Sequence, residues 1–186
     1  PRRRTRQIDQ AELWQYLHDI TIQDLGVYDT DPDKHACHVD KGDPSTEETH
    51  GFNIQHCVRA TIKNCKAVDV GDECFDMSHC IDSVMTDNVV IKNDITGKGG
   101  GSISVGDGSK NVTISNNEII FNADDDPSVS HYGVAIEALS EHIEDITITD
   151  NTFSGSSVTQ DKNSIIKLCY NIDLLKMKNH SSAFHS

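Results

Sequence analysis

The stretch Val112-Thr113-Ile114-Ser115-Asn116 returns almost unchanged as Ile146-Thr147-Ile148-Thr149-Asp150. In each copy a polar spacer separates two apolar residues, and an Asn or Asp follows two positions after the second one, the anchor. Apolar residues that alternate with polar ones predict a short strand with one buried face. Asn or Asp after the strand predicts a turn. The phrase recurs along the chain, with anchors at Ile22, Ile62, Ile91, Ile114, Ile148 and Met177.

A second alternating phrase lies between the anchors. Its copies are Gly51-Phe52-Asn53-Ile54, Cys74-Phe75-Asp76-Met77, Ser102-Ile103-Ser104-Val105, Gly133-Val134-Ala135-Ile136 and Ser164-Ile165-Ile166-Lys167-Leu168. Two or three short strands in every repeat are typical of a parallel β-solenoid. We therefore predict an all-β parallel solenoid of about six coils over residues 19–179. The Asn and Asp residues after the anchors are expected to stack as an internal ladder of side-chain amides.

Composition agrees with a solenoid and excludes several functions. The chain has 186 residues, of which 35% are hydrophobic and 5% aromatic, as expected for an interior of stacked aliphatic side chains. It carries 30 acidic against 16 basic residues, a net charge of −14. Such acidity argues against binding to nucleic acid or to anionic membranes. No apolar run is long enough for a membrane span. A β-sandwich, the alternative fold, gives no reason for the repeated phrase.

The two ends fall outside the repeats. Residues 1–18 are expected to form a lead-in, and apolar residues spaced as in a helix between Ile8 and Leu17 suggest a helix that caps the first coil. An irregular lead-in is the alternative. Residues 180–186 are expected to be a C-terminal tail that carries no repeat and is frayed or covered by a partner chain. A homotrimer or end-to-end docking is the expected form of any assembly.

Four short segments resemble the signatures of the polygalacturonase family of glycoside hydrolases. They are Glu48-Thr49-His50-Gly51, Gly71-Asp72-Glu73-Cys74, Gly99-Gly100-Gly101 and Gly133-Val134-Ala135-Ile136-Glu137. That family belongs to the pectin-lyase-like superfamily, so the resemblance implies a right-handed parallel β-helix that acts on carbohydrate. It also implies that Asp72 is the general acid. The histidine of the third signature is replaced here by glycine. The arginine and lysine that bind galacturonate correspond to Ala135 and Glu137, so a clamp for an anionic sugar is missing.

The repeats also predict a site without reference to any family. With the second phrases in register, outward residues form three columns: His50, Glu73, Gly101 and Tyr132; Asn53, Asp76, Ser104 and Ala135; Gln55, Ser78, Gly106 and Glu137. Neighbouring coils are about 4.8 Å apart. Crowded carboxylates push their pKa values apart, which suits general acid–base catalysis.

We expect one patch to carry the catalytic groups, with Asp72 as the acid and Glu73, Asp76 or His50 as the base or water-positioning group. The expected substrate-binding residues are Asn53, Ser104, Glu137, Lys63 and Lys92. A cation site and an ordinary polar surface are the alternatives for this patch.

No cofactor is required by these motifs, although two acidic loops offer hard oxygen ligands that suit calcium. The calcium candidates are Asp29, Asp31, Asp33, Asp40, Asp43, Asp124, Asp125 and Asp126. Solvated loops are the alternative. Zinc would need the segment His35-Ala36-Cys37-His38 together with His50, His56 or Cys57. Six cysteines leave two alternatives open: a bridge from Cys57 or Cys74 to Cys80, or free thiols inside the coil.

The sequence supports three functional hypotheses. The first is hydrolysis of a glycosidic bond in a polysaccharide by an extracellular or surface-associated protein. The second is a non-catalytic glycan-binding or virion and surface structural module. The third is a calcium-assisted polysaccharide lyase or epimerase, for which Arg59 is the main candidate to neutralise a uronate.

Overall fold

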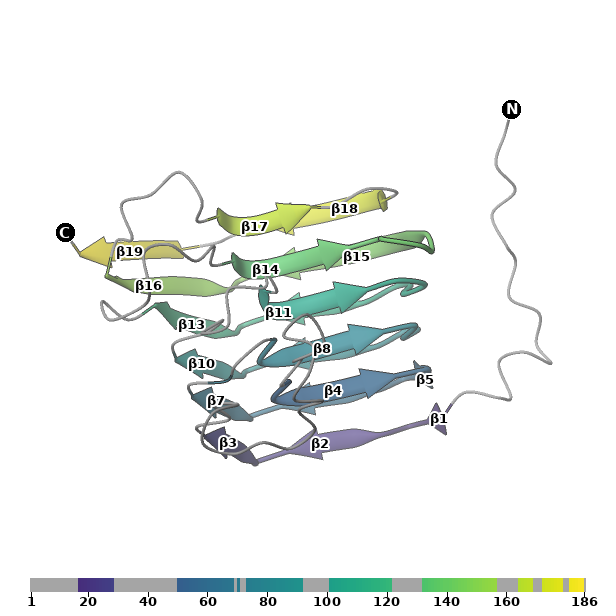
Figure 1. Cartoon of the computed structure of the whole chain (residues 1–186), viewed down its shortest axis with the longest axis horizontal. Helices are drawn as coiled ribbons and strands as arrows, with labels where there is room; N and C mark the ends of the chain where they lie inside the picture. Colours follow the sequence, from purple (N-terminus) through teal and green to yellow (C-terminus); the bar gives the residue numbers. More distant parts are fainter. Residues whose placement is uncertain are drawn as a thin grey trace, which may run out of the picture.

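The computed structural model describes residues 17–28, 50–68, 70, 73–91, 101–121, 132–156, 164–168, 172–178 and 181–185. These residues form strands that stack coil upon coil, from the purple N-terminal strands at the bottom of Figure 1 to the yellow C-terminal strands at the top. The first sheet consists of β4 (Phe52–Gln55), β8 (Phe75–Ser78), β11 (Gly101–Gly106), β14 (Tyr132–Glu137) and β17 (Ser164–Leu168).

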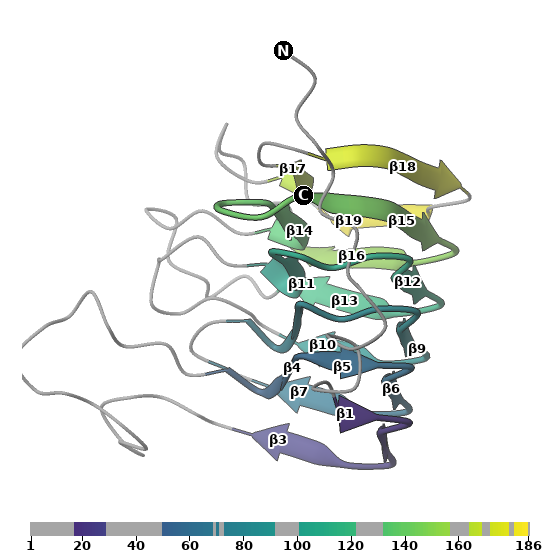
Figure 2. The ribbon, with the colours of Figure 1, turned by 90° about the vertical axis from the view of Figure 1, so that its right-hand side faces the viewer.

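Two further sheets complete each coil, and the side view separates them (Figure 2). The second consists of β2 (Thr21–Gln23), β6 (Thr61–Lys63), β9 (Val84–Thr86), β12 (Thr113–Ser115), β15 (Ile143–Thr149) and β18 (Ile172–Lys178). The third consists of β3 (Gly26–Tyr28), β7 (Lys66–Val68), β10 (Val89–Ile91), β13 (Glu118–Phe121), β16 (Thr152–Ser156) and β19 (Ser181–His185). All pairs are parallel, so the six-coil solenoid is confirmed.

The register confirms the second phrases and corrects one copy of the first. Phe52 pairs with Phe75 and Phe75 with Ile103, as the predicted columns require. In the third coil, however, Ile62 pairs with Met85 and not with Ile91. Ile91 lies on β10 in the third sheet, next to Val68. Both Val84-Met85-Thr86 and Val89-Val90-Ile91 fit the anchor phrase. The prediction of Ile91 as the anchor, from the more aliphatic of the two stretches, is wrong.

Residues in the left-handed backbone conformation bend the chain at fixed places. Asp24, Asn64, Asp87, Asn116 and Asp150 all have φ between 51° and 58°, each directly after a strand of the second sheet. Asn and Asp tolerate this conformation better than other residues with a side chain. The prediction that Asn and Asp make the turns is therefore confirmed. Two further columns bend the chain between the first and second sheets: His56 with His79 and Gly108, and Asp19 with Arg59, Asp82, Asn111 and Asp145.

The expected amide ladder exists, but it is built from the next residue along the chain. Nδ2 of Asn88 donates to Oδ1 of Asn117 over 3.0 Å, and Nδ2 of Asn117 donates to Oδ1 of Asn151 over 2.9 Å. The left-handed residues that follow the second-sheet strands are all exposed. The ladder residues are buried, because the left-handed bend turns the following side chain inward. The free thiol of Cys65 occupies the ladder position in the second coil, where its backbone N–H donates to Oδ1 of Asn88.

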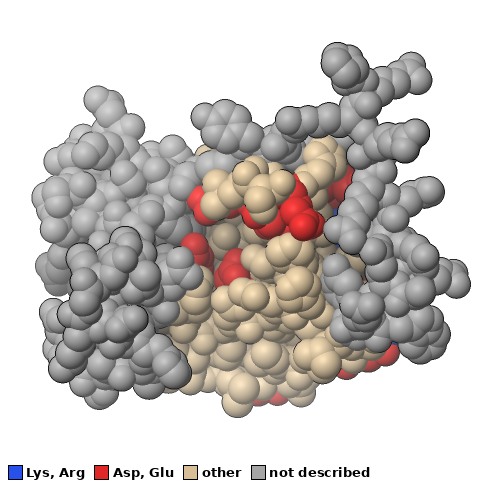
Figure 3. Space-filling view, turned by 45° about the vertical axis from the view of Figure 1, so that its right-hand side comes forward, with Lys and Arg blue, Asp and Glu red and all other residues tan. Residues whose placement is uncertain are grey.

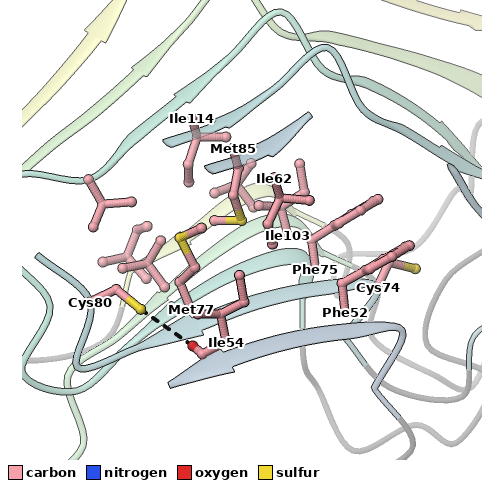
Figure 4. Packing of buried hydrophobic residues seen from close by; sticks show 14 of the residues in the cluster. Phe52, Ile54, Ile62, Cys74, Phe75, Met77, Cys80, Met85, Ile103 and Ile114 are labelled. Atoms are coloured by element: carbon pink, nitrogen blue, oxygen red, sulfur yellow. Dashed lines mark hydrogen bonds between the residues drawn. The ribbon is translucent and has the colours of Figure 1, made fainter. Parts of the chain in front are cut away.

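The interior is filled by side chains that stack on their counterparts in neighbouring coils (Figure 4). The rings of Phe52 and Phe75 are parallel within 2°, with centroids 5.0 Å apart. The thiol of Cys80 lies in this core, 3.4 Å from the carbonyl oxygen of Ile54, and burial raises its pKa to about 12. All four cysteines in the described residues are buried and none forms a disulfide bond: Cys57, Cys65, Cys74 and Cys80. The alternative of stacked free thiols is thus the one that the structure takes for these four.

The ends differ from the expectation where the structure describes them. Residues 1–16 lie outside the described residues, and Leu17–His18 form β1, which pairs with β5 (Cys57–Val58). The tail expected from residue 180 is corrected, because Ser181–His185 form β19 and pair with β16. This strand satisfies backbone groups that β16 would otherwise leave at an open edge. Within the described part of the chain, no helix has the length and apolar character needed to cross a membrane.

Removal of one ladder amide should destabilise the fold strongly. In an Asn117→Ala variant, the buried backbone N–H of Asn88 and the carbonyl oxygen of Met85 lose the Asn117 side chain as a partner, and Nδ2 of Asn88 keeps only the carbonyl oxygen of Ile62. Each unsatisfied buried group costs about 1–3 kcal/mol, so we expect a loss of roughly 3 kcal/mol or more in the free energy of unfolding. Denaturant titration measures it. The control is Asn116→Gly at the neighbouring exposed turn, where glycine can adopt the same positive φ. Equal losses of unfolding free energy in the two variants would contradict the role of the ladder.

Candidate functional site

A hollow of about 210 Å³ opens on the outer face of the first sheet. Acidic side chains gather around a depression on this side of the molecule, shown in red in Figure 3. The hollow is lined by His50, Asn53, Gln55, Glu73, Asp76, Ser78, Ser104, Gly106, Asp107, Glu137 and Leu139. Most of these residues come from the outward columns, since the alternation that turns Phe52 and Phe75 inward turns Asn53 and Asp76 outward.

Asp76 lies at the centre of the hollow and is almost completely buried, with 6% of its surface exposed. It is flanked in register by Asn53 on the coil below and by Ser104 on the coil above. Burial and the negative charge of Glu73 raise the pKa of Asp76 to about 7, and the charge of Glu137 adds to this rise. His50 and a hydrogen bond with the Ser104 side chain act in the opposite direction. Asp76 is therefore a carboxyl group that keeps its proton to near neutrality.

His50 and Glu73 form a close pair at the start of the first sheet. Nδ1 of His50 lies 2.9 Å from Oε2 of Glu73, and the two side chains are 20% and 12% exposed. The backbone holds the pair in place, because the N–H of Gly51 donates to the carbonyl oxygen of Glu73 over 2.9 Å. A Cβ at Gly51 would lie 2.5 Å from the carbonyl oxygen of Cys74, so only glycine fits between the two coils here. The pair lies close enough to Asp76 for the charge of Glu73 to raise the pKa of that buried carboxyl group.

The other end of the hollow is shaped by Asp107 and Glu137. Asp107 accepts the backbone N–H and the hydroxyl of Ser140 over 2.9 and 2.7 Å, and the N–H of Glu141 over 3.2 Å. Burial alone would raise the pKa of Asp107, but these hydrogen bonds outweigh it and lower the pKa. Asp107 is thus a fixed carboxylate. A Cβ at Gly106 would collide with Oγ of Ser78, so glycine keeps this end open.

The structure brings most of the predicted site residues together. His50, Asn53, Glu73, Asp76, Ser104 and Glu137 all line the hollow. Asp72, the expected acid, lies outside the described residues, as does Lys92. Lys63 is on β6 in the second sheet, where its register neighbours are Gln23 and Thr86. The sequence pattern places Lys63 and Lys92 in one column on adjacent coils, and this prediction is wrong because it rests on the misassigned anchor at Ile91.

Two lining residues were missed. Asp107 and Leu139 follow the ends of β11 and β14, beyond the alternating phrases from which the site was predicted. The only signal in the sequence was the turn-forming Gly106-Asp107-Gly108, and Asp in a turn normally hydrogen-bonds to its own loop. Asp107 instead binds the backbone of the next coil. That contact depends on the stacking of loops, which the alternation pattern does not describe.

No metal site is evident in the part of the chain that the structure describes. There, no group of three or more His, Cys, Asp or Glu side chains is arranged to hold an ion. The calcium candidates Asp29, Asp31, Asp33, Asp40, Asp43, Asp124, Asp125 and Asp126, and the zinc candidates His35, Cys37 and His38, lie outside the described residues. His56 stacks on His79, with ring centroids 4.5 Å apart. Arg59 forms a two-point ion pair with Asp19, over 2.6 and 2.9 Å, away from the hollow.

Comparison with known proteins agrees with this architecture. The family described as "Right handed beta helix region" matches residues 19–171, which is most of the chain. No curated protein and no solved structure was found to match. The right-handed parallel β-helix that the sequence predicts thus has support from the stacked parallel sheets and from this match. The chain belongs to the family of right-handed β-helix proteins.

Proposed function

We propose that this protein hydrolyses a glycosidic bond of a polysaccharide in the hollow of the first sheet. The observation that supports the proposal best is Asp76, a buried carboxyl group whose pKa is raised to about 7 at the centre of an open hollow. A carboxylic acid that keeps its proton near neutral pH is the group that glycosidases use to protonate the leaving oxygen. Right-handed β-helices occur in polysaccharide-active enzymes and in other proteins, so the fold alone does not decide the function.

The two carboxyl groups nearest the centre have different environments, which suits the division into acid and base. Asp76 is buried and raised in pKa, whereas Glu73 acts on it as a negative charge and lies against His50. Asp76 would donate its proton to the glycosidic oxygen, and Glu73 with His50 would take a proton from the attacking water. Glu73 lies three residues before Asp76, with a bend at Cys74 between them, and its negative charge acts on Asp76. Inverting enzymes keep about 6.5–9.5 Å between their two carboxyl groups and retaining enzymes about 5–5.5 Å, so the anomeric configuration of the product decides between the two mechanisms.

The charge of the hollow favours this chemistry over the alternatives. Cleavage of a glycosidic bond passes through a transition state with positive charge on the sugar ring. Carboxylates fixed around the hollow stabilise such charge without having to reorganise. A lyase or epimerase acting on uronates needs a cation to neutralise the substrate. Among the described lining residues there is no Lys or Arg, and Arg59 is paired with Asp19 elsewhere. Asp72 remains a predicted site residue and stays in the proposal as a neighbour of Glu73.

Replacement of the proposed acid should abolish most of the activity. We expect Asp76→Asn to lower kcat on a glycan that the wild type cleaves by roughly 100- to 10,000-fold, the usual contribution of a general acid. Asparagine has nearly the same shape, but its amide has no acidic proton that can be transferred to the leaving oxygen. A panel of neutral and charged polysaccharides, with product analysis by NMR to determine the anomeric configuration, measures both rate and stereochemistry. The control is Asp24→Asn at an exposed left-handed turn. No cleavage of any glycan by the wild type would favour the non-catalytic module instead.

The rate should depend on pH through the same group. Because the acid form of Asp76 is required and its pKa is about 7, kcat/KM should fall about ten-fold per pH unit above that value. A profile of kcat/KM from about pH 5 to about pH 9 tests this. If kcat/KM stays constant up to about pH 9, the general acid is a group other than Asp76.

Stability should show the cost of burying this carboxyl group. The pKa of Asp76 is higher in the folded state, about 7, than its ordinary value of 3.8, so folding is favoured by the protonated form. The wild type should therefore lose stability as the pH rises from about 4 through about 7, by up to about 4 kcal/mol. Asp76→Asn removes this dependence. Denaturant titrations at several pH values should show that the unfolding free energy of the variant, relative to that of the wild type, increases up to about pH 7. A difference in unfolding free energy that does not change with pH would contradict a buried acid with a raised pKa.

A further inference from the structure

The corner between the first and second sheets becomes longer from coil to coil beside the hollow. A single residue forms this corner in the coils of β4 and β8, namely His56 and His79. In the coil of β11 the corner contains residues 107–108, and in the coil of β14 it contains residues 138–142, after which the register resumes. The longest corner reaches the hollow, because Leu139 is one of the lining residues.

Asp107 ties this longest corner to the coil below it. Its Oδ1 accepts the backbone N–H of Ser140 over 2.9 Å and that of Glu141 over 3.2 Å, and its Oδ2 accepts the Ser140 hydroxyl over 2.7 Å. The backbone of Asp107 is held in turn, because its carbonyl oxygen accepts the N–H of His79 over 2.7 Å. Hydrogen bonds to a charged acceptor are stronger than those between neutral groups. One carboxylate therefore fixes the corner relative to the coils beneath it.

The fixed corner presents an apolar side chain at the rim of a polar hollow. Leu139 is 72% exposed and directly precedes the two residues that Asp107 binds. Exposed apolar side chains are common on protein surfaces, and most of them need no explanation. This one lies on an inserted loop that a rigid scaffold holds beside a concave site, which is where proteins commonly carry binding residues.

The floor next to this corner is open and neutral. Gly106 has no side chain, and Oγ of Ser78 reaches into the space that a Cβ at Gly106 would fill. Gln55 is in register with Ser78 one coil below, and its exposed side chain lines the same hollow. A hydroxyl and an amide can both donate and accept hydrogen bonds, as the hydroxyl groups of a sugar do.

Charged residues of both signs lie on the coils above this floor. Glu137 is in register with Gly106. Lys167, one coil higher, is in register with Ala135, two positions earlier on the same strand as Glu137. Recognition by Leu139, Ser78 and Gln55 therefore depends on apolar contact and neutral hydrogen bonds, and not on the net charge of the hollow.

The floor at Gly106 lies one sugar unit away from the proposed acid. Gly106 is two positions further along β11 than Ser104, which pairs with Asp76. This offset places the backbones of Gly106 and Asp76 roughly 8 Å apart, from about 3.3 Å per residue and about 4.8 Å per coil. A glycan with one bond held over Asp76 therefore brings a neighbouring unit to Leu139.

We propose, building on the hydrolase function proposed above, that Leu139 is a specificity-determining residue that binds an uncharged pyranose unit next to the cleaved bond, and that Asp107 is the positioning residue that holds it. The C–H groups of one face of the ring contact Leu139, and removal of both apolar surfaces from water stabilises the complex. The ring hydroxyls hydrogen-bond with Ser78 and Gln55. A charged substituent on this unit would lose water without an opposite charge among these three side chains.

Hydrogen exchange tests the positioning role without any ligand. In Asp107→Asn, the backbone amides of Ser140 and Glu141 lose a charged acceptor, so we expect them to exchange roughly ten-fold faster or more, as followed by NMR. The control is Asp82→Asn, an exposed carboxylate that also binds the next coil, by accepting Nδ2 of Asn111 over 2.7 Å. Unchanged exchange of both amides in Asp107→Asn would overturn the positioning role.

Binding to the cleavage-deficient Asp76→Asn protein tests the recognition separately from the chemistry. Calorimetric titration compares hexasaccharides of β-1,4-glucan, β-1,3-glucan and β-1,4-mannan with those of galacturonate and of glucosamine. We expect a neutral hexasaccharide to bind most tightly and Leu139→Ala to weaken its binding roughly ten-fold. Asp107→Asn should also weaken it, but should add little once Leu139 is replaced, because Asp107 acts through Leu139. Asp82→Asn should leave the affinity unchanged.

The outcomes separate this inference from the hydrolase proposal. A charged hexasaccharide as the tightest ligand, no binding of any of the five, or no effect of Leu139→Ala would overturn the recognition of an uncharged unit. Additive losses from Leu139→Ala and Asp107→Asn would overturn the positioning role. On a glycan that the wild type cleaves, Leu139→Ala should raise KM more than it lowers kcat, whereas Asp76→Asn lowers kcat. Binding that depends on Leu139, without cleavage of any glycan by the wild type, would overturn the hydrolase proposal alone.

Discussion

The stack of coils depends on the hydrogen bonds that buried asparagines make at one corner. The strands β6, β9, β12 and β15 of the second sheet are each followed by a left-handed residue, and the side chain after that residue is buried in the interior. There Asn88, Asn117 and Asn151 satisfy the backbone groups of the coils on either side as well as one another. A buried N–H or carbonyl without a partner costs as much as a lost hydrogen bond, so this corner must be fully paired for the coils to close. The rest of the register follows from that closure.

The same register creates the site. Because each coil repeats the alternation of the coil below, residues far apart in the sequence come together on one outer face. Asp76 thus lies between Asn53 and Ser104, which come from different coils. The neighbouring coils cover most of its carboxyl group, and this burial is what raises its pKa. The fold therefore tolerates one destabilising carboxyl group in a well-packed scaffold, as is common where proteins carry out chemistry.

Periodicity predicts some features of this protein and not others. The strands, the parallel stacking and the three outward columns follow from alternation, and His50, Glu73 and Asp76 were expected to meet. Alternation does not distinguish Met85 from Ile91 as an anchor, because both lie in suitable phrases. It also cannot show which residue after a bend points inward, so the ladder was placed one residue early. Burial of Asp76 depends on the side chains of two other coils, and for that reason the sequence could not assign the raised pKa to Asp76.

The three corners of the coil differ in how much chain they contain. The bends between the second and third sheets have a fixed length, set by left-handed residues such as Asn64 and Asn116. The connections from the third sheet to the first vary: β7 ends at Val68 and β8 begins at Phe75, whereas β3 ends at Tyr28 and β4 begins at Phe52. The first sheet begins beside His50 and Glu73, at the edge of the hollow. Insertions and deletions in evolution would therefore accumulate where ligand preference is decided, while the scaffold keeps its dimensions.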